Sequence, residues 1–404
     1  ETMASKSLKR KNEVKSLDLV LANIRNTYGA NAIYRASEAK FLDVVRQRSG
    51  IHAIDFATGG GYPYGRYTHI YGPEGVSKTY TAMKAAATVQ ADHPTALVVW
   101  VDLERVFDKK RAKQVGVDLR RLIVINEESI ERNLSIAEQF IEVAEVKLFV
   151  FDSVAAIITI AELEDEVEGQ SMGVGARLLN KFLRRWTAKT APKKNATPPS
   201  FVILLNQVRE KINKGFTGPI PPKPQPTGGR GLRFFTSLAL EMAKGDRIEV
   251  SSKDDDSDNT IIGHEVKVLV VKNNTFPPNR VGKFLLVTRP LDVGGYQLPA
   301  NSVDNARDLV RYGKFYGVLA ESGAWVSYGN KKWNGRLAAQ AAVAGDETLQ
   351  ADIYTEIMDA INKKLGVYQE ATEEKSEAGA GGLRALARKK AAGERKPVAQ
   401  QRRR

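Results

Sequence analysis

Short apolar runs alternate with longer helix-like runs along the middle of the chain, from about residue 50 to residue 290. Several apolar runs are almost uninterrupted and rich in β-branched residues, which is typical of strands buried on both faces of a sheet. This alternation predicts a doubly wound α/β fold with a mainly parallel sheet. We expect strands at residues 67–71, 96–101, 122–125, 148–151, 201–205, 237–241 and 266–271.

The two ends of the chain follow other patterns. Apolar residues recur at three- and four-residue spacing over 14–28, which predicts a helix that ends before Gly29. A short extended piece follows at 32–35, and this arm either caps its own domain or docks on a neighbour. In the last quarter of the chain the pattern predicts a small α+β unit with a helix at 306–316, a strand at 323–328 and further helix at 337–365.

These changes of pattern divide the chain into four expected parts. The first is an N-terminal helix-strand arm, the second an α/β core, the third a small C-terminal α+β domain and the fourth a basic, low-complexity tail that we expect to be disordered. Their expected bounds are 1–41, 42–293, 294–367 and 368–404.

Composition limits the class of protein. The chain has 404 residues, enough for at least one large core, and it contains no cysteine. Disulfides and cysteine-based zinc sites are therefore excluded, and the four histidines do not pair at metal-ligand spacing. No apolar run reaches the roughly 18 residues of a membrane span, and no signal peptide is evident. We expect a cytoplasmic protein without a membrane partner.

The net charge of +14 is concentrated near the two ends. Residues 1–15 hold five Lys or Arg against two Glu, and residues 384–404 hold nine against one. The long middle is therefore only weakly basic. Such tails are either solvated and disordered or flexible electrostatic tethers for phosphate backbones.

The segment after the first predicted strand carries the main candidate chemistry. It reads YGPEGVSKT and leads into an Ala-rich helical run. In this context a turn of small residues presents backbone N–H groups to a triphosphate; Lys78 adds a charge, and the Thr79 hydroxyl is a ligand for Mg²⁺. An ordinary Gly/Ser turn is the alternative. The candidate nucleotide-binding residues are Gly72, Pro73, Glu74, Gly75, Val76, Ser77, Lys78, Thr79 and Tyr80.

One position departs from the usual phosphate-loop pattern, which has glycine directly before the lysine. Here that residue is Ser77. If the backbone needs a positive φ at this point, a residue other than glycine is strained, unless Gly75 takes up the geometry instead.

Two carboxylates end predicted strands downstream. Asp152 closes an apolar strand and is a candidate to hold Mg²⁺. Strand alternation puts Asp102 and Glu104 on one side of another strand, where Glu104 is a candidate base for the attacking water. The alternative for Glu104 is a surface salt bridge.

Gln207 follows the strand predicted at 201–205 and precedes a segment crowded with Pro, Gly and Lys. It is placed either to sense a γ-phosphate and pull on that segment, or merely to cap a strand end. Segments of this kind inside a compact domain are functional or disordered. Two are expected here, at about 162–175 and 208–231.

Taken together, these motifs resemble the RecA-type recombinases. The shared features are the phosphate loop, the sequence FDSVAA at 151–156, and the sequence LNQVR at 205–209. Residues 166–177 resemble the family's first DNA-binding loop, and residues 227–229 and 232–234 resemble the end of its second DNA-binding loop. The sequence GAWVSY at 323–328 matches the family's smaller domain. The likeness runs from about residue 17 to 366 and implies a RecA-like P-loop ATPase core.

The resemblance also implies an activity. It implies an ATP-dependent, Mg²⁺-dependent ATPase that forms helical filaments on single-stranded DNA, pairs it with double-stranded DNA and exchanges strands. The N-terminal arm would then pack on an adjacent subunit as an oligomerisation arm. ATP would lie between protomers.

Site residues follow from the resemblance position by position. Thr79 and Asp152 would hold the metal, and Asp108 and Arg111 would lie near the base of the nucleotide. The implied catalytic residues are Lys78, Glu104, Gln207 and, reaching in from the neighbouring protomer, Lys272. The implied DNA-binding residues are Met172, Gly173, Arg177, Arg184, Arg209, Lys211, Ile212, Gly228 and Gly229, with Ile212 as an apolar wedge between stacked bases.

The chain departs from the family pattern at several places. The family usually offers two lysines to the neighbouring ATP, but here Lys272 is followed by Asn274 at the second position, which should slow hydrolysis or change its salt dependence. Arg111 stands where an aromatic residue often contacts the adenine. The tail is basic, whereas familiar bacterial members end in acidic residues.

Two other functions stay open on the sequence. One is a different motor with the same core, such as a hexameric helicase or a ring-forming ATPase. The other is a filament that coats single strands and uses ATP as a switch with negligible turnover, which Ser77 and Asn274 favour. DNA-stimulated hydrolysis separates the second from a recombinase.

Overall fold

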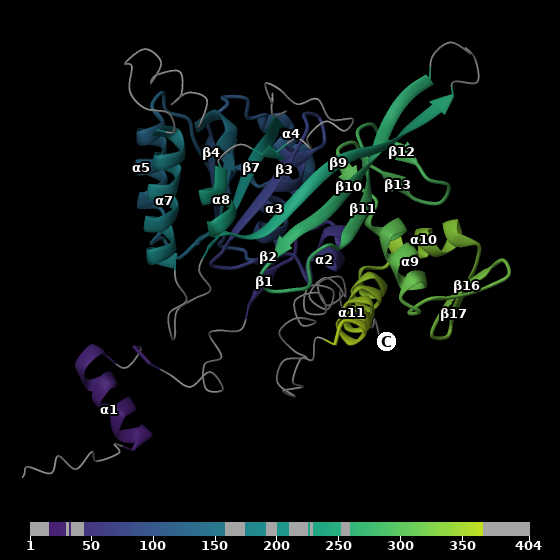
Figure 1. Cartoon of the computed structure of the whole chain (residues 1–404). Coiled ribbons are helices and arrows are strands. Elements are labelled where there is room, and N and C mark those ends of the chain that lie inside the picture. Colours follow the sequence, from purple (N-terminus) through teal and green to yellow (C-terminus); the bar gives the residue numbers. More distant parts are fainter. Residues whose placement is uncertain are drawn as a thin grey trace, which may run out of the picture.

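The computed structural model describes residues 16–29, 32–33, 44–157, 174–190, 200–209, 225–226, 229–251 and 259–366. Within them a long sheet has helices on both faces, and a smaller group of helices and strands lies at one end (Figure 1). The helices are α1 (Leu17–Tyr28), α2 (His52–Thr58), α3 (Lys78–Asp92), α4 (Lys109–Val115), the 3₁₀ turn η3 (Leu119–Arg121), α5 (Ile130–Gln139), α7 (Val174–Thr190), α8 (Gly229–Phe235), α9 (Asn305–Phe315), α10 (Arg336–Ala344) and α11 (Glu347–Lys364).

The strands fall into one large sheet and several small ones. The large sheet contains β3 (Tyr67–Gly72), β4 (Leu97–Asp102), β5 (Leu122–Ile125), β6 (Val146–Asp152), β7 (Phe201–Arg209), β8 (Gln225–Pro226), β9 (Thr236–Ser251), β10 (Asn259–Asn273), β11 (Val281–Val287) and β14 (Ser302–Val303). The small sheets contain β1 (Arg46–Gln47), β2 (Tyr62–Pro63), β12 (Leu291–Asp292), β13 (Gln297–Leu298), β15 (Ala320–Ser322), β16 (Trp325–Tyr328) and β17 (Lys331–Asn334).

The order of the large sheet is β14-β11-β10-β9-β3-β7-β6-β4-β5. From β9 to β5 the neighbours are parallel, and from β9 to β14 they are antiparallel. The predicted doubly wound, mainly parallel sheet is therefore confirmed. The main difference is the length of β9 and β10, which have 16 and 15 residues. They form a ribbon whose outer part carries exposed charged side chains, so apolarity alone predicts only the inner half of each strand.

Alternate residues of the parallel strands enter two separate cores. Trp100 packs on one face with residues of α3 and α4. Val99 and Val101 pack on the other face, where Leu134 of α5 and Trp186 of α7 cover the sheet. Because both faces are buried, these strands have no polar alternation, which is the pattern seen in the sequence.

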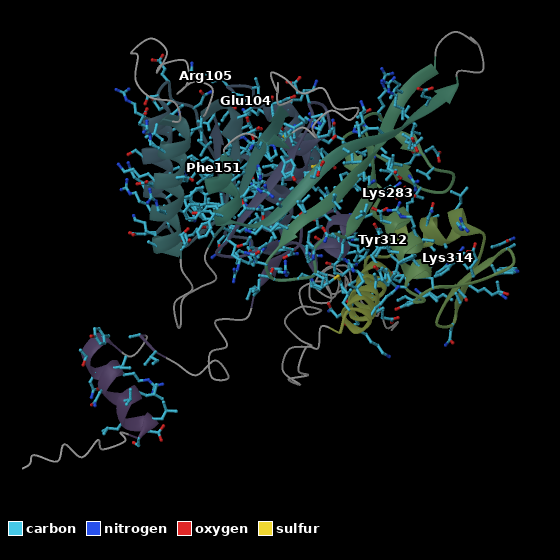
Figure 2. The ribbon with its side chains drawn as sticks, viewed as in Figure 1. Glu104, Arg105, Phe151, Lys283, Tyr312 and Lys314 are labelled. Carbon is cyan, nitrogen blue, oxygen red and sulfur yellow. The ribbon has the colours of Figure 1, made fainter. Side chains whose placement is uncertain are left out.

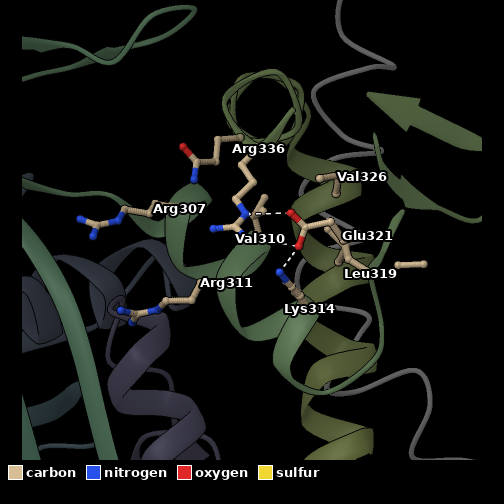
Figure 3. Close-up of a pocket in the computed structure, with 10 residues that line it drawn as sticks. Arg307, Val310, Arg311, Lys314, Leu319, Glu321, Val326 and Arg336 are labelled. Carbon is tan, nitrogen blue, oxygen red and sulfur yellow. Dashed lines mark hydrogen bonds and ion pairs between the residues drawn. The ribbon is translucent and has the colours of Figure 1, made fainter. Parts of the chain in front are cut away.

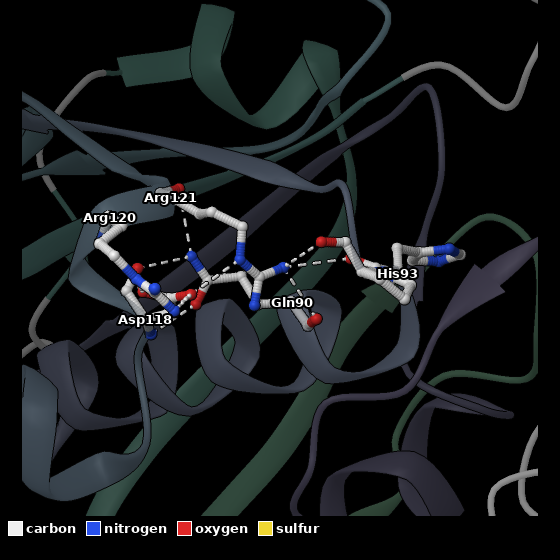
Figure 4. Close-up of polar contacts among 6 residues, drawn as sticks. Gln90, His93, Asp118, Arg120 and Arg121 are labelled. Atoms are coloured by element: carbon white, nitrogen blue, oxygen red, sulfur yellow. Dashed lines mark hydrogen bonds and ion pairs between the residues drawn. The ribbon is translucent and has the colours of Figure 1, made fainter. Parts of the chain in front are cut away.

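Helix α3 follows the phosphate loop and is fixed at its far end. The Nη1 of Arg121 donates to the carbonyl oxygens of Gln90, His93 and Pro94 at 3.0, 3.3 and 3.0 Å (Figure 4). The Gln90 side chain in turn accepts the N–H of Asp118 at 2.8 Å. Helix ends leave carbonyl groups unsatisfied, and a cation there is favourable. The helix behind the phosphate loop is thus held firmly in place.

The C-terminal unit has its own core, built from α9, α10, α11 and β16. The further helix expected over 337–365 is present, but it is divided in two, because α10 ends at Ala344 and α11 begins at Glu347. Asp346 accepts the N–H of Leu349 at 2.9 Å and so caps α11. An aspartate that satisfies a free backbone N–H favours a helix start over a continuous helix.

Helix α1 confirms the N-terminal helix expected from periodicity, although it begins at Leu17 and not at residue 14. It has no buried residue, and it lies apart from the sheet (Figure 1). Leu17 and Leu19 are 59% and 51% exposed. Part of its apolar face is therefore uncovered within one chain.

A buried acid lies where α9 meets the sheet. Asp308 is 1% exposed, and Arg311 donates to its Oδ1 at 3.0 Å. Burial raises the pKa of Asp308 to about 8; Arg311 opposes this rise, and the neighbouring Asp304 and Glu265 add to it. Lys283 and Tyr312 meet at the same junction, where the Lys283 N–H donates to the Tyr312 hydroxyl at 3.3 Å (Figure 2).

We predict that Asp308→Asn changes the pH dependence of stability. Between the ordinary pKa near 3.8 and the folded value of about 8, the folded chain binds one proton more than the unfolded chain at this site. This group therefore makes the free energy of unfolding fall as pH rises through that window. The variant lacks this effect. Its free energy of unfolding relative to that of the wild type should therefore rise by up to about 1.4 kcal/mol for each unit of increase in pH.

Urea unfolding of both proteins across this window measures the effect. Asp246→Asn, which removes an exposed carboxylate of β9, is the control for simple charge loss. A difference between Asp308→Asn and wild type that stays constant with pH would mean that Asp308 is ionised in the fold.

Candidate nucleotide-binding site

The candidate residues meet at the carboxyl ends of β3, β4, β6 and β7. These strands are parallel neighbours, so their carboxyl ends lie at one edge of the sheet. Asp102 lies opposite Asp152 in the register of β4 and β6, and Gly72 lies opposite Gln207 in the register of β3 and β7. Topology alone thus assembles this edge from four distant parts of the sequence.

The phosphate loop leaves β3 and turns into α3 through two left-handed residues. Gly75 has φ 71° and Ser77 has φ 70°. The strain expected at Ser77 is therefore present, and Gly75 does not replace it; such a conformation costs a residue other than glycine about 1–2 kcal/mol. Gly72 is required for another reason, because a Cβ there would lie 2.2 Å from the carbonyl oxygen of Met242.

Lys78 is folded back onto the loop. Its Nζ donates to the carbonyl oxygens of Gly72 and Pro73 at 2.9 and 2.7 Å. Partial burial lowers the pKa of Lys78, while Asp152, Glu104 and Glu74 oppose the fall. Lys78 is also the first residue of α3, so a cation and a helix N-terminus occur together at the loop, and both favour a bound anion.

Thr79 and Asp152 form the candidate metal site. The Thr79 hydroxyl donates to Asp152 Oδ2 at 3.2 Å. Burial, followed by the charges of Glu104 and Asp102, raises the pKa of Asp152 to about 7. Oxygen ligands beside excess negative charge fit a hard divalent cation such as Mg²⁺. In the described part of the chain no group of three His, Cys, Asp or Glu residues could hold a metal, so water and phosphate oxygens would have to complete the shell.

Glu104 lies in the turn beyond β4, at the edge of the sheet (Figure 2). The expectation that strand alternation sets its direction is wrong, because β4 ends at Asp102. The Asp102 carboxylate instead accepts the N–H groups of Val106 and Phe107 at 3.2 and 2.9 Å, which shapes the turn. The N–H of Glu104 donates to the Asp152 carbonyl at 3.2 Å.

The Glu104 carboxylate has two side-chain donors. The hydroxyl of Ser153 and the Nε2 of Gln207, the latter at 3.3 Å, both donate to its Oε1. In the described part of the chain Glu104 takes part in no ion pair within 4.0 Å, so the surface salt bridge considered above is not what holds it. The contact with Ser153 was not foreseen, since Ser153 carries no signal of its own beyond its place after Asp152.

Gln207 lies inside β7, which continues to Arg209 and does not end at residue 205 as expected. Beyond Gln207 the strand pairs with β8, through Val208 with Pro226 and Arg209 with Gln225. Gln207 is thus not a simple cap of a strand end. Its backbone is fixed beside Gly72, and its side chain reaches Glu104.

The remaining candidates for nucleotide contact lie at the rim. Asp108 caps α4 by accepting the N–H of Arg111 at 2.9 Å. The Nε of Arg111 is buried and has no hydrogen-bond partner among the described residues. The side chains of Val76 and Tyr80 are 2% and 1% exposed and pack in the core, so only their backbone groups face the loop.

Lys272 is not part of this cluster within one chain. It lies on β10, where its Nζ donates to the carbonyl oxygen of Arg233 at 2.8 Å. Burial, followed by the charge of Arg233, lowers the pKa of Lys272. The expected role of Lys272 across a subunit boundary stays a prediction.

Among the expected DNA-binding residues, five lie outside the described residues: Met172, Gly173, Lys211, Ile212 and Gly228. For Arg209 and Gly229 the structure describes only their place in β7 and α8. Arg177 and Arg184 are exposed on α7, two turns apart, opposite the face that buries Phe182 and Trp186. The structure thus places two of the expected arginines on one solvent face.

A cavity of about 240 Å³ lies elsewhere, in the C-terminal unit between α9, α10 and β15 (Figure 3). Glu321 in this cavity pairs with Arg336 at 3.0 Å and with Lys314. No residue of the phosphate loop lines it. The candidate nucleotide site is an open edge of the sheet and not this cavity.

His264 is a residue at the site that sequence reasoning missed. Its Nε2 lies 3.1 Å from Ser77 Oγ. The sequence separates the two by more than half of the core, and only the pairing of β10 beside β9 brings them close. Histidine spacing in a sequence indicates metal sites, and it gives no signal for a single hydrogen bond between one histidine and a distant serine.

Comparison with known proteins identifies relatives over most of the chain. A family model described as the RecA N-terminal domain matches residues 15–289. Protein RecA of Mesomycoplasma hyopneumoniae (strain J) is 34% identical over 366 residues, which cover 90% of this chain and 98% of the relative. The chain belongs to the RecA family.

Other relatives give the same result. Protein RecA of Chloroherpeton thalassium is 32% identical and covers 86% of this chain and 90% of its own length. Protein RecA of Macrococcus caseolyticus is 33% identical, with 90% and 95% covered. The resemblance to RecA-type recombinases is thereby confirmed: the chain is a RecA recombinase of DNA recombination and repair, and a DNA-dependent ATPase. Each helix in the described part of the chain is too short or too polar to span a bilayer.

Proposed function

We propose that this RecA family member binds Mg-ATP between protomers, forms helical filaments on single-stranded DNA and exchanges strands with double-stranded DNA. The observation that carries this proposal is the contact of Glu104 with both Ser153 and Gln207. It joins the candidate hydrolytic carboxylate to β7, the strand that leads into the predicted second DNA loop at 208–231. The same contact would then respond to the state of the nucleotide and affect DNA binding.

Glu104 is the proposed base. Its carboxylate is held by two donors on one oxygen, Oε1, which leaves Oε2 to orient a water molecule and accept its proton as that water attacks the γ-phosphorus. Lys78 would exchange its contacts with two loop carbonyls for the β- and γ-phosphate oxygens. The ammonium group of Lys78 is then already in place before negative charge develops on the phosphate in the transition state.

Thr79 and Asp152 are the proposed ligands of Mg²⁺. When bound, this ion neutralises charge on the phosphate oxygens. The raised pKa of Asp152 supports the assignment: burial, followed by the charges of Glu104 and Asp102, disfavours the bare carboxylate, and a bound cation would relieve this.

The neighbouring protomer is proposed to complete the site through Lys272. The exposed apolar residues of α1 support self-association, because Leu17 and Leu19 are not buried against any core within the described residues. We propose that the arm at 1–41 packs on an adjacent subunit, beside a core at 42–293 and a C-terminal domain at 294–367.

DNA is proposed to bind along α7 and the two predicted loops. Arg177 and Arg184 present positive charge from a face that carries none of the core, and such contacts to phosphates bind any sequence. Arg209 and Lys211 would add to them, while Ile212 would separate stacked bases.

The second candidate is a filament in which ATP acts mainly as a switch and its DNA-dependent hydrolysis is slow. The φ of 70° at Ser77 favours it, because a strained phosphate loop is a reason for slow turnover. The presence of Asn274 at the position of a second lysine acts in the same direction. Turnover therefore decides between the two candidates.

We predict that filaments require both ligands. Electron microscopy should show a helical coat on single-stranded DNA with a non-hydrolysable ATP analogue, and none when either the DNA or the analogue is left out. The reason is that the phosphates complete the subunit seam and order the loops that hold DNA. Equal assembly without any nucleotide would contradict the proposal.

We predict that Glu104→Gln lowers DNA-stimulated ATP hydrolysis at least about a hundredfold, because an amide cannot accept the proton of the attacking water. Binding of a fluorescent ADP analogue should change far less, since the phosphate loop is intact. Steady-state phosphate release measures hydrolysis, and fluorescence titration measures nucleotide binding.

Glu128→Gln, at an exposed carboxylate, is the matched control. If wild type and Glu104→Gln hydrolyse at the same low rate, the switch candidate holds.

A further inference from the structure

The hydroxyl of Ser77 is turned away from the helix that it precedes. Ser77 is the N-cap of α3, yet its side chain makes no capping hydrogen bond, because its φ of 70° and ψ of 28° place the residue in the left-handed region. A serine in this place normally accepts an N–H of the first turn. Here only its carbonyl serves the helix, accepting the N–H of Thr81 at 3.0 Å. The hydroxyl is left to interact with another element.

That element is β10, which carries His264. The Nε2 of His264 lies 3.1 Å from Ser77 Oγ, and the residue is 8% exposed. The pairing of β10 with β9 is irregular on both sides of this residue, with register shifts between Ile261 and Gly263 and between His264 and Val266. Such irregularities redirect side chains and are common near functional sites. Here His264 reaches the phosphate loop from a strand that does not belong to it.

The surroundings keep the imidazole neutral. Burial, followed by the charges of Lys244 and Arg111, lowers the pKa of His264. A neutral ring can donate a hydrogen bond to a hydroxyl or accept one from it through Nε2, depending on the tautomer. It adds no charge to the loop. The cations around the ring also make it a poor metal ligand, and no other histidine lies beside it.

We propose that His264 is a positioning residue for ATP, which holds Ser77 in the left-handed conformation that the phosphate loop requires. With glycine at this position the backbone would adopt that conformation without help. With serine it needs an external partner, and His264 is that partner. The pair thus replaces a glycine by two side chains, one in the loop and one on β10. This inference rests on the nucleotide-binding role of the loop.

A double-mutant cycle tests the inference. The proteins are wild type, His264→Ala, Ser77→Gly and the double variant, and the readout is the dissociation constant of a fluorescent ADP analogue without DNA. We expect His264→Ala to weaken binding by about three- to tenfold, the size of one neutral hydrogen bond. On the Ser77→Gly background the same substitution should change binding by less than about twofold, because glycine needs no support.

Steady-state hydrolysis adds a second readout. His264→Ala should raise KM for Mg-ATP by a similar factor and change kcat much less, since the loop is misplaced before binding and is restored once the phosphates are bound. His264→Gln should recover most of the loss, because its side-chain amide reaches about as far as Nε2. His93→Ala is the matched control: His93 Nε2 lies 3.1 Å from the Tyr64 hydroxyl, in a similar pair away from the loop.

The outcomes are distinct. An equal effect of His264→Ala on both backgrounds would overturn the inference, and so would the absence of any effect on wild type. Thermal unfolding of the four proteins shows whether a weakened variant is simply unfolded, in which case the cycle is measured with His264→Leu, which fills the space but cannot hydrogen-bond Ser77, in place of His264→Ala. The cycle needs neither DNA nor filaments. If nucleotide binds but DNA does not stimulate hydrolysis, the proposed function fails while the inference on His264 is still decided.

Discussion

The proposed coupling between nucleotide and DNA depends on the parallel pairing of β3 with β7, which puts Gly72 beside Gln207. The phosphate loop begins at Gly72, and the Gln207 side chain reaches Glu104 at 3.3 Å. Both strands are buried in the middle of the sheet, so their relative position is fixed. A change at the γ-phosphate would therefore have a direct mechanical path through Glu104 to β7, and from Arg209 onward to the predicted DNA loop.

Charge balance is the second constraint on the site. Asp152, Glu104 and Asp102 converge at one edge of the sheet, where burial and the other two carboxylates raise the pKa of Asp152 and the charge of Lys78 opposes the rise. Repulsion among these carboxylates makes the arrangement unfavourable until Mg²⁺ and the nucleotide phosphates bind together. Keeping it requires rigid support, which comes from the two cores on either side of the sheet and from Arg121 at the far end of α3. Stability elsewhere in the fold thus maintains an unfavourable cluster of like charges.

Much of this fold could be predicted from sequence because buried parallel strands show uninterrupted apolarity, and the phosphate loop could be predicted because its backbone chemistry needs particular residues. The break between α10 and α11 depends on one capping contact of Asp346, which periodicity does not register. The direction of Glu104 depends on where β4 ends and on Asp102 holding the next turn. His264 depends on strand order and on irregular pairing, which no local pattern contains. The roles of the site residues and the domain bounds stay predictions.

The most direct test of the central claim is the effect of nucleotide on DNA affinity in a Gln207→Ala variant. Fluorescence anisotropy of a labelled single-stranded oligonucleotide gives the ratio of dissociation constants without and with a non-hydrolysable ATP analogue. Arg120→Ala, at an exposed arginine of η3, is the control. We expect a ratio well above one for the wild type and the control, and a ratio near one for Gln207→Ala with nucleotide affinity retained. A variant whose ratio matched that of the wild type would contradict the coupling through Glu104 and Gln207.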